Sequence, residues 1–416
     1  MQEPTLSDKL VFPDGHDWIE AGGATSAKGW RAAAFAAGLK AGRDDMALLF
    51  SDFPCECAAL FTSNKIPAAP VRYDRPLAAR GKCRAVVVNV GCANACTGEA
   101  GFADTVETGR VAAEAAGIPV GEMLVCSTGT IGRRLALGRV LDGARALPAL
   151  LSPEGGKAAA RAIMTTDTVP KQAAVSFEHR GRKYTVGGMC KGSGMICPNL
   201  ATTLIFATTD APVGKTALRA ALSGAAERSF NRITVDGDQS TNDTFVLFAN
   251  GAAGGPEFAP GRPGWKKFCD AVCAVALSLA RQIVRDGEGA SKFVTVAVEG
   301  AASARDALAG CRAIANSPLF KAACYGGDPN WGRVISAIGN SGAKCAEGRT
   351  RIWFDDVCVF DRGKIASDED NARLAKVMAR RAFEVRVDLG MGKFADAVYT
   401  SDLTHEYVNI NADYTT

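Results

Sequence analysis

A glycine-rich stretch that ends in two threonines, KGSGMICPNLATT (191–203), is the first place where this sequence could do chemistry. Glycines let a backbone turn tightly or approach a ligand closely. A threonine hydroxyl becomes a useful nucleophile when a base activates it. The segment can therefore present Thr202 for nucleophilic attack at the edge of a sheet. A plain glycine-rich turn before a strand remains the alternative, because threonine is common in strands.

A second stretch, CSTGTIG (126–132), places hydroxyls and two glycines at the predicted end of a strand. Backbone amides freed at such a turn can donate to a developing oxyanion, and Thr128 would add its hydroxyl beside Gly129. An ordinary glycine turn is the alternative. The stretch is thus a candidate oxyanion site.

Two polar segments follow, TTDTVPK (165–171) and VDGDQSTNDT (235–244). The first clusters hydroxyls around Asp167, either as polar donors lining a loop or as a solvated turn. The second lacks the residue order of a calcium loop, so we predict no metal there; a buried polar network that braces a site is the other interpretation.

Because the chain has only 3 histidines, none in a recognisable catalytic context, the base need not be an imidazole.

The bulk composition is that of an ordinary globular protein, with 47% hydrophobic and 22% charged residues. The net charge of +4 is small and the Lys and Arg residues are scattered, which argues against a nucleic-acid partner. The 14 cysteines show no zinc-site spacing and follow no secretory signal, so we expect free thiols in the cytoplasm. No apolar run is long enough to span a bilayer, so we expect no membrane association.

Strands and helices alternate along the chain, which predicts a layered α/β fold. The pattern alone leaves two architectures open, a doubly wound sheet and a sandwich of sheets covered by helices. The predicted strands are residues 46–52, 57–64, 84–90, 122–128, 183–192, 202–210, 232–238, 244–251, 292–300 and 351–360. The predicted helices are residues 104–116, 152–164, 215–228, 266–286, 303–314 and 370–382.

A chain of 416 residues is longer than one compact core usually holds, so we expect two domains. The segment DGEGASK (286–292) follows a long predicted helix and is a plausible hinge. We therefore predict a body of residues 1–285 and a C-terminal lobe of residues 286–416.

Nearly from end to end, the sequence resembles the ornithine acetyltransferases, also called glutamate N-acetyltransferases, of arginine biosynthesis. It departs from the usual pattern of that family at Cys92, Cys197, Leu200 and Thr203. The segments that carry the resemblance are KGWRAAAFAAGLKAGRDDMALL (28–49), NVGCANACTGEAGFADT (89–105), CSTGTIG, TTDTVPK, GGMCKGSGMICPNLATTLIFATTDA (187–211), SFNRITVDGDQSTNDT (229–244), DGEGASKFVTVAVEGAAS (286–303), ACYGGDPNWGRV (323–334) and DLTHEYVNINADYTT (402–416).

The resemblance implies that the precursor cuts itself between Ala201 and Thr202. The products would be an α chain of residues 1–201 and a β chain of residues 202–416, associated as two of each or in a larger assembly. Thr202 would then be an N-terminal nucleophile that carries its own base. An α-amine has a pKa of about 7.7–8.0, so a useful share is neutral near pH 7, which fits the scarcity of histidine.

The resemblance also implies the reaction. Thr202 would take an acetyl group from N-acetylornithine and pass it to glutamate through an acetyl ester, a ping-pong mechanism that needs no cofactor and no metal. Acetyl-CoA is a possible second donor, and no residue decides this. The implied fold is a four-layer α/β/β/α sandwich of the aminopeptidase/ornithine acetyltransferase type, with a smaller C-terminal α/β domain whose tail returns to the active site.

The site residues implied by the resemblance come from distant parts of the chain. Thr128 and Gly129 would form the oxyanion hole. One threonine of TTDT would contact substrate; we favour Thr168, with Thr165 and Thr166 as the alternatives. The other implied substrate-binding residues are Lys191, Thr202, Glu288, Asn411 and Thr416.

Two other functions compete with acetyl transfer. An aminopeptidase or amidase on the same fold would resolve the acyl-enzyme with water, although the distant relatives that do so tend to use serine. A ligand-binding protein that has lost self-processing is the non-enzymatic alternative. The intact Thr202, together with both oxyanion candidates, argues against it.

Overall fold

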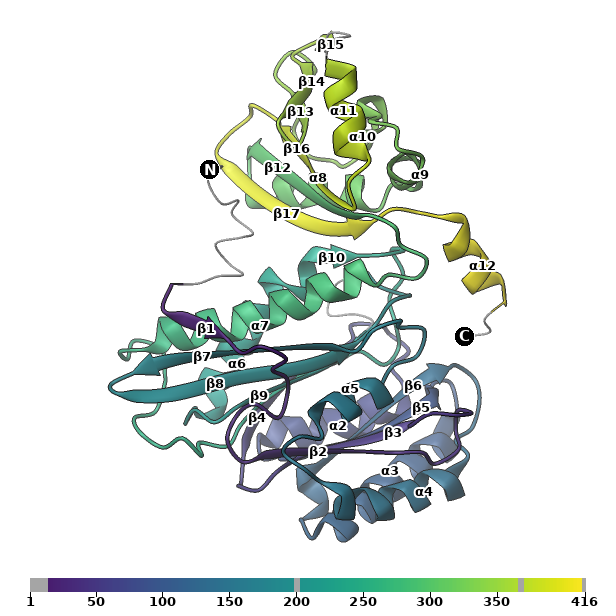
Figure 1. Cartoon of the computed structure of the whole chain (residues 1–416), viewed down its shortest axis with the longest axis vertical. Coiled ribbons are helices and arrows are strands. Elements are labelled where there is room, and N and C mark those ends of the chain that lie inside the picture. The colour runs from purple at the N-terminus through teal and green to yellow at the C-terminus, as the bar shows by residue number, and fades with distance from the viewer. Residues whose placement is uncertain (1–13, 198–202, 366–369, 414–416) are drawn as a thin grey trace. The chain divides into compact units, whose positions relative to one another are not determined.

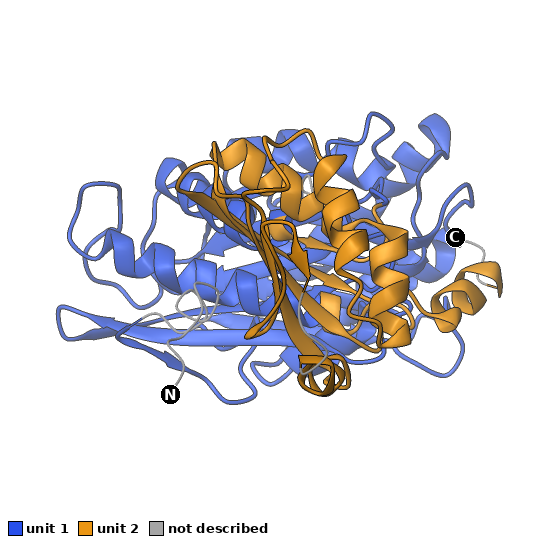
Figure 2. Ribbon diagram, turned by 90° about the horizontal axis from the view of Figure 1, so that it is seen from above, with its two compact units in different colours: residues 1–231, 238–283, 416 blue, residues 232–237, 284–415 orange. Residues whose placement is uncertain are grey.

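The computed structural model describes residues 14–197, 203–365 and 370–413. The chain forms two compact units, coloured separately in Figure 2. The described residues of the first unit fall within 1–231 and 238–283, and those of the second within 232–237 and 284–415. The chain thus enters the second unit twice, first for a short segment and then for its C-terminal third.

The first unit contains a six-stranded sheet with the order β1-β7-β8-β9-β11-β4. Strands β9 and β11 are parallel to each other, whereas the other neighbours are antiparallel. Every residue of β9 and β11 is buried, as expected for apolar strands covered on both faces. The strands are β1 (His16–Trp18), β4 (Glu56–Phe61), β7 (Lys171–His179), β8 (Arg182–Lys191), β9 (Leu204–Thr209) and β11 (Thr244–Ala249).

A second sheet in this unit has the order β2-β3-β5-β6, with β5 and β6 parallel. Its side chains alternate between two cores, because successive strand residues point to opposite faces. Val86 and Val88 pack in the core shared with the first sheet, whereas Val87 packs against helices on the other face. The strands are β2 (Trp30–Phe35), β3 (Met46–Ser51), β5 (Ala85–Cys92) and β6 (Met123–Thr130).

Helices cover the outer faces of both sheets, which gives the predicted four-layer α/β/β/α order and decides between the two architectures left open by the pattern (Figure 1). Helices α6 and α7 lie against the six-stranded sheet, and α3 and α4 against the four-stranded one. The helices of this unit are α2 (Ala69–Arg80), α3 (Gly98–Ala116), α4 (Leu137–Ala146), α5 (Gly156–Ala162), α6 (Lys215–Arg228) and α7 (Trp265–Arg285), the last of which runs into the second unit.

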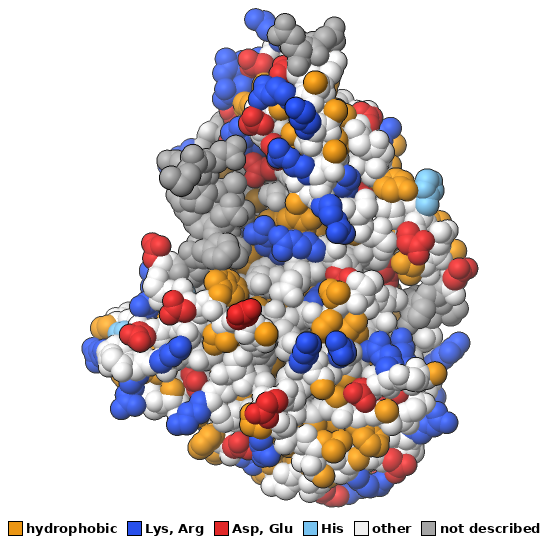
Figure 3. Space-filling view, viewed as in Figure 1, with side chains coloured by type: hydrophobic (Ala, Val, Ile, Leu, Met, Phe, Trp, Pro, Cys, Tyr) orange, Lys and Arg blue, Asp and Glu red, His pale blue; other side chains and the backbone are white. Residues whose placement is uncertain are grey.

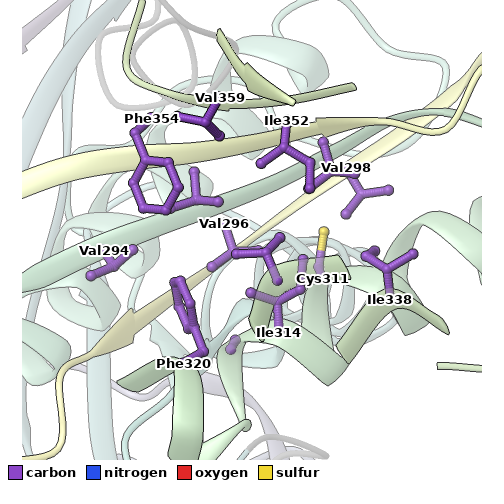
Figure 4. Close-up of a cluster of buried hydrophobic side chains, with 14 of the residues drawn as sticks. Val294, Val296, Val298, Cys311, Ile314, Phe320, Ile338, Ile352, Phe354 and Val359 are labelled. Carbon is purple, nitrogen blue, oxygen red and sulfur yellow. The ribbon is translucent and has the colours of Figure 1, made fainter. Parts of the chain in front are cut away.

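The second unit is a seven-stranded mixed sheet with the order β10-β17-β12-β16-β13-β14-β15. Figure 4 shows its core, where valines of β12 pack against Cys311, Ile314 and Ile338 from helices α8 and α10. The elements are β10 (Ile233–Thr234), β12 (Phe293–Ala301), α8 (Ala304–Ala315), α9 (Pro318–Gly326), α10 (Trp331–Gly339), β13 (Arg351–Phe354), β14 (Val357–Asp361), β15 (Lys364–Ile365), α11 (Asn371–Met378), β16 (Ala382–Asp388), β17 (Phe394–Ser401) and α12 (His405–Asp413).

Three predicted elements differ from those observed in this unit. The predicted strand 232–238 is only the two-residue β10. The predicted strand 351–360 is a hairpin of β13 and β14, because the chain turns at Asp355, whose φ is 50°. The predicted helix 370–382 ends at Met378, after which the chain enters β16.

On the face drawn in Figure 3, Lys and Arg side chains are interspersed with Asp and Glu. Within the part of the chain that the structure describes, no helix is both long and apolar enough to cross a membrane.

Candidate active site

The predicted site residues fall into three groups. Ala201, Thr202 and Thr416 lie outside the described residues. The described ones in the first unit are Thr128, Gly129, Thr168 and Lys191, and those in the second unit are Glu288 and Asn411.

Gly129 lies near the end of β6, in register with Gly91 of β5. Its φ is 133°, a conformation that L side chains rarely adopt. A Cβ atom at Gly129 would lie 2.4 Å from the carbonyl carbon of Gly91 and 2.6 Å from the amide nitrogen of Cys92. Only glycine fits this backbone, because any side chain would collide with the neighbouring strand β5.

Thr128 precedes this glycine and faces the other sheet of the unit. Its side chain is nearly buried, and its hydroxyl accepts a hydrogen bond from Lys191 Nζ at 3.4 Å. Lys191 is the last residue of β8 in the six-stranded sheet. The predicted oxyanion residue and the predicted substrate-binding lysine, which are 63 residues apart, are therefore neighbours.

The chain re-enters the six-stranded sheet beside this pair. In the β8–β9 ladder Lys191 is opposite Leu204. The preceding residue, Thr203, is buried, and its carbonyl accepts the Thr244 amide at 3.0 Å. Thr203 directly follows the predicted nucleophile in the chain, so the described chain resumes beside Lys191.

Asp167 organises the loops around Lys191. One carboxylate oxygen accepts Lys171 Nζ and the Gly192 amide, each at 2.7 Å, and the other accepts the Thr165 amide at 3.0 Å. Burial by itself would raise the pKa of Asp167, but the ammonium groups of Lys191 and Lys171 and these hydrogen bonds outweigh it and lower the pKa. TTDTVPK is therefore an ordered polar loop rather than a solvated turn.

Removing this carboxylate should destabilise the first unit. The side chains of Asp167 and Lys171 are both fully buried, so Asp167→Ala would remove the carboxylate that pairs with a buried ammonium group, which typically costs about 3–5 kcal/mol. We expect the free energy of unfolding, measured by urea denaturation with fluorescence of the buried Trp30, to fall by that amount. The control Asp52→Ala removes an exposed ion pair to Arg31 and should cost less than about 1 kcal/mol.

The same pair predicts a pH dependence. Because folding lowers the pKa of Asp167, its contribution is complete above the unfolded value of about 3.9 and is lost as the pH falls below it. The difference in stability between the wild type and Asp167→Ala should therefore shrink in acid. A difference that is unchanged from neutral pH to pH about 3 would contradict this account of the pair.

The threonines of TTDT occupy different environments. Thr168, which we favoured as a substrate contact, is exposed. The Thr166 hydroxyl makes a 2.7 Å hydrogen bond with the Ser193 hydroxyl of the glycine-rich stretch. Thr166 therefore fastens this loop to the segment that leads to the cleavage point, and the choice among the three threonines stays a prediction.

Asn242 joins the two sheets at the site. It precedes β11 of the six-stranded sheet, yet its side-chain amide donates to the carbonyls of Ala93 and Ser127, at 2.7 and 2.8 Å. Ser127 lies on β6 of the other sheet, and Ala93 directly follows β5 of that sheet. The Ser127 carbonyl belongs to the peptide that ends in the Thr128 amide. The segment VDGDQSTNDT thus ends in a buried polar network that braces the site, which is the alternative to a calcium loop that its sequence suggested.

Asp243 follows with a fully buried carboxyl group. Burial raises its pKa well above the usual value, and neither oxygen accepts a hydrogen bond. The Thr62 hydroxyl lies near it but donates to the Ser240 carbonyl instead. Burial therefore favours the neutral form of this carboxyl group, whereas the charge of Lys191 favours the ionised form.

The second unit brings together its own two predicted substrate contacts. The Asn411 side chain donates to a Glu288 carboxylate oxygen at 2.8 Å. Helix α12, which carries Asn411, is fastened to the DGEG turn by Thr404, whose hydroxyl donates to the Gly289 carbonyl at 2.8 Å. A Cβ at Gly289 would lie 2.5 Å from the Tyr407 amide, so this glycine permits the close approach.

A comparison with protein-family models matches residues 31–416 to a model described as the ArgJ family. The chain belongs to the ArgJ family. This confirms the resemblance seen in the sequence, since ArgJ relatives match over nearly their whole length.

Two curated ArgJ proteins illustrate that match. Each is described as an "arginine biosynthesis bifunctional protein ArgJ". The protein from Symbiobacterium thermophilum is 49% identical over 96% of this chain and 100% of its own. That from Geobacter sulfurreducens is 48% identical over 94% of this chain and 99% of its own.

Among solved structures, an ornithine acetyltransferase from Mycobacterium tuberculosis, complexed with ornithine, is 42% identical to this chain. The match covers 45% of this chain and 100% of that one, with a TM-score of 0.42.

Some residues around the predicted site have no signal that we recognised in the sequence. Asp167 and Asn242 lie within polar segments that we noted, but their partners are up to 149 residues away. Among the described residues, no cluster of His, Cys, Asp and Glu could hold a metal ion.

Proposed function

We propose that this protein is a glutamate N-acetyltransferase of arginine biosynthesis, which moves an acetyl group from N2-acetyl-L-ornithine to L-glutamate. Membership of the ArgJ family and near full-length relatives named for arginine biosynthesis support this activity. The observation that carries it is the hydrogen bond between Lys191 and Thr128, the residue before Gly129, next to the strand that begins at Leu204. Oxyanion donors and a carboxylate-binding cation belong together in acyl transfer between amino acids.

The first step of the proposal is self-cleavage. The Thr202 hydroxyl attacks the carbonyl carbon of Ala201 as the C–N bond breaks, which leaves an ester and a new α-amine on Thr202. Water then hydrolyses the ester, so that the Ala201 carboxylate ends one chain and Thr202 begins the next. Afterwards the α-amine takes the proton of the hydroxyl, a role for which its pKa of about 7.7–8.0 is suited.

The second step is acetyl transfer through two half-reactions. Thr202 attacks the acetyl carbonyl of N-acetylornithine, the Thr128 hydroxyl and the Gly129 amide stabilise the oxyanion, and ornithine leaves with a proton on its amine. The amine of glutamate then attacks the acetyl ester and restores the hydroxyl. Lys191 pairs with a substrate carboxylate in each half-reaction, and Glu288 with Asn411 receives the side-chain ammonium of ornithine.

Isotope exchange tests this scheme directly. A ping-pong enzyme should exchange labelled ornithine into N-acetylornithine without glutamate present, because the first half-reaction is reversible by itself. Adding glutamate should divert the acetyl group to N-acetylglutamate. Exchange that requires glutamate would contradict an acetyl-enzyme, and acetate as the main product at saturating glutamate would favour the amidase.

Two further measurements test the second acetyl donor and the assembly of the chains. An arm with acetyl-CoA in place of acetylornithine tests the second donor, for which the sequence offers no deciding residue. Native mass measurement of the purified protein tests the association of two α and two β chains. A cytoplasmic location and the absence of a cofactor stay predictions from the sequence.

A further inference from the structure

A buried polar pair lies near the end of the two parallel strands that carry or adjoin the oxyanion residues. Asn89 of β5 and Ser127 of β6 are direct partners in the ladder, and both are almost fully buried. Two residues earlier on the same face of each strand are Val87 and Val125, which belong to an apolar core. Burying polar groups is costly unless they are hydrogen-bonded, so packing alone does not explain this pair.

The side-chain amide of Asn89 uses both of its ends. Its oxygen accepts the Ser127 hydroxyl at 2.6 Å, and its nitrogen donates to the Cys92 carbonyl at 3.2 Å. Cys92 is the last residue of β5, whereas Ser127 belongs to β6. One side chain therefore links the end of one strand to the neighbouring strand, in addition to the backbone ladder.

Both partners of Asn89 lie next to Gly129. Ser127 is two residues before Gly129 on β6, and a Cβ at Gly129 would lie 2.6 Å from the Cys92 amide nitrogen. The register of the ladder shifts at the same place, because Cys92 is opposite both Thr128 and Thr130. Such a shift locally disrupts the ladder, so side-chain contacts gain weight in fixing the direction of the Gly129 amide.

Ser127 is held at two points. Its hydroxyl donates to Asn89, and its carbonyl accepts the Asn242 side-chain amide at 2.8 Å. We propose that Asn89 is a positioning residue for the oxyanion site, which acts through Ser127 to keep the Gly129 amide directed at the reacting carbonyl oxygen. This inference rests on the proposed function and adds to it a residue that touches no reacting atom.

The direction of the side chains agrees with a positioning role. Successive residues of a strand point to opposite faces of its sheet. The Thr128 side chain points toward the six-stranded sheet, where it meets Lys191. Asn89 and Ser127 therefore lie on the other face of their sheet, away from the side on which Thr128 would meet a substrate.

Infrared spectroscopy of the acetyl-enzyme tests this role. The wild type and Asn89→Ala are treated with N-acetylornithine that carries a heavy carbon isotope at the acetyl carbonyl, in the absence of glutamate. A hydrogen bond to a carbonyl oxygen weakens the carbonyl bond and lowers its stretching frequency, so the ester band reports the alignment of the oxyanion donors. In Asn89→Ala the band should move to higher frequency than in the wild type.

Single-turnover acetylation gives the kinetic counterpart. The plateau rate of Asn89→Ala should fall about 10- to 100-fold, because a displacement of about 1 Å at a reacting centre can already cost about 100-fold. The half-saturating concentration of acetylornithine should not change, since no contact with the substrate is lost. A rise in that concentration with an unchanged plateau rate would contradict positioning.

Two further variants separate alignment from general loosening. Ser127→Ala removes only the hydroxyl between the strands and should move the band and the rate in the same direction as Asn89→Ala. Ser229→Ala removes an equally buried hydroxyl, which donates to the Ala225 carbonyl at 2.6 Å, and should change neither. An unchanged band in Asn89→Ala, or an equal shift in Ser229→Ala, would overturn the inference.

Ser127→Ala decides the question if Asn89→Ala does not fold. An ester band at the wild-type frequency in Ser127→Ala would then rule out positioning through Ser127. By contrast, a wild type that forms no acetyl-enzyme from acetylornithine refutes the proposed function itself. The failure of the inference and the failure of the proposed function are therefore distinguishable.

Discussion

Thr202→Ala should yield one full-length chain that transfers no acetyl group. Without the hydroxyl, the bond after Ala201 has no attacking atom, and no acetyl ester can form on residue 202. A denaturing gel should show one band, against two for the wild type, whose β chain should begin at Thr202 by mass spectrometry. Acetyl transfer should fall to the background of the assay.

The neighbouring Thr203 provides the matched control. Its side chain is buried, and Thr203→Val has nearly the same shape without the hydroxyl. This variant should still be cut and should still form an acetyl-enzyme. If Thr202→Ala is still cleaved, or if Thr203→Val is no longer cleaved although Thr202 is intact, the assignment of Thr202 as the nucleophile is wrong.

Gly129→Ala should have the second-largest effect, because the new methyl group has no room. Its Cβ would lie 2.4 Å from a backbone carbon of Gly91, so the strand end has to move and the Gly129 amide moves with it. Loss of one oxyanion donor typically slows acyl transfer about 100- to 1,000-fold. We expect a loss of at least that size in single-turnover acetylation, and slower self-cleavage, since both steps pass through an oxyanion.

Gly132→Ala is the control for backbone strain alone. Gly132 also has a positive φ, 78°, but a Cβ there would meet nothing within 4 Å. Both variants therefore share the strain of an L residue at positive φ, and only Gly129→Ala adds the collision. Equal losses of acetylation rate in the two variants would show that strain, and not the position of the amide, explains the effect.

The interior strands of the first unit were predictable from the sequence because each is a short apolar run. Strands β5, β9 and β11 are buried along most of their length, so their residues are hydrophobic on both faces. Strand β2 was missed, because its sequence WRAAAF is rich in alanine, which has a weak preference for strands. The hydrogen bonds of its antiparallel pairing with β3 stabilise the extended conformation that its own residues only weakly favour.

The site was predictable only in part. Thr128, Gly129 and Lys191 stand in segments that resemble a known family, but the contact between Thr128 and Lys191 joins different sheets. A local pattern cannot report such a pairing, because register and sheet packing decide it. Asp167 could be noticed as polar, whereas its burial with Lys171 depends on how two loops fold over the strand ends.

The double hydrogen bond of Asn242 has a mechanical consequence. Sheets that face one another through apolar side chains alone can slip with little cost, because such contacts have no direction. Here one amide donates to a carbonyl on β6 of the opposite sheet and to another just after β5, and a slip of one residue, about 3.3 Å, would break both bonds. Asn242 consequently keeps the strand end that carries Thr128 and Gly129 in fixed alignment with the six-stranded sheet, although it need not touch a substrate.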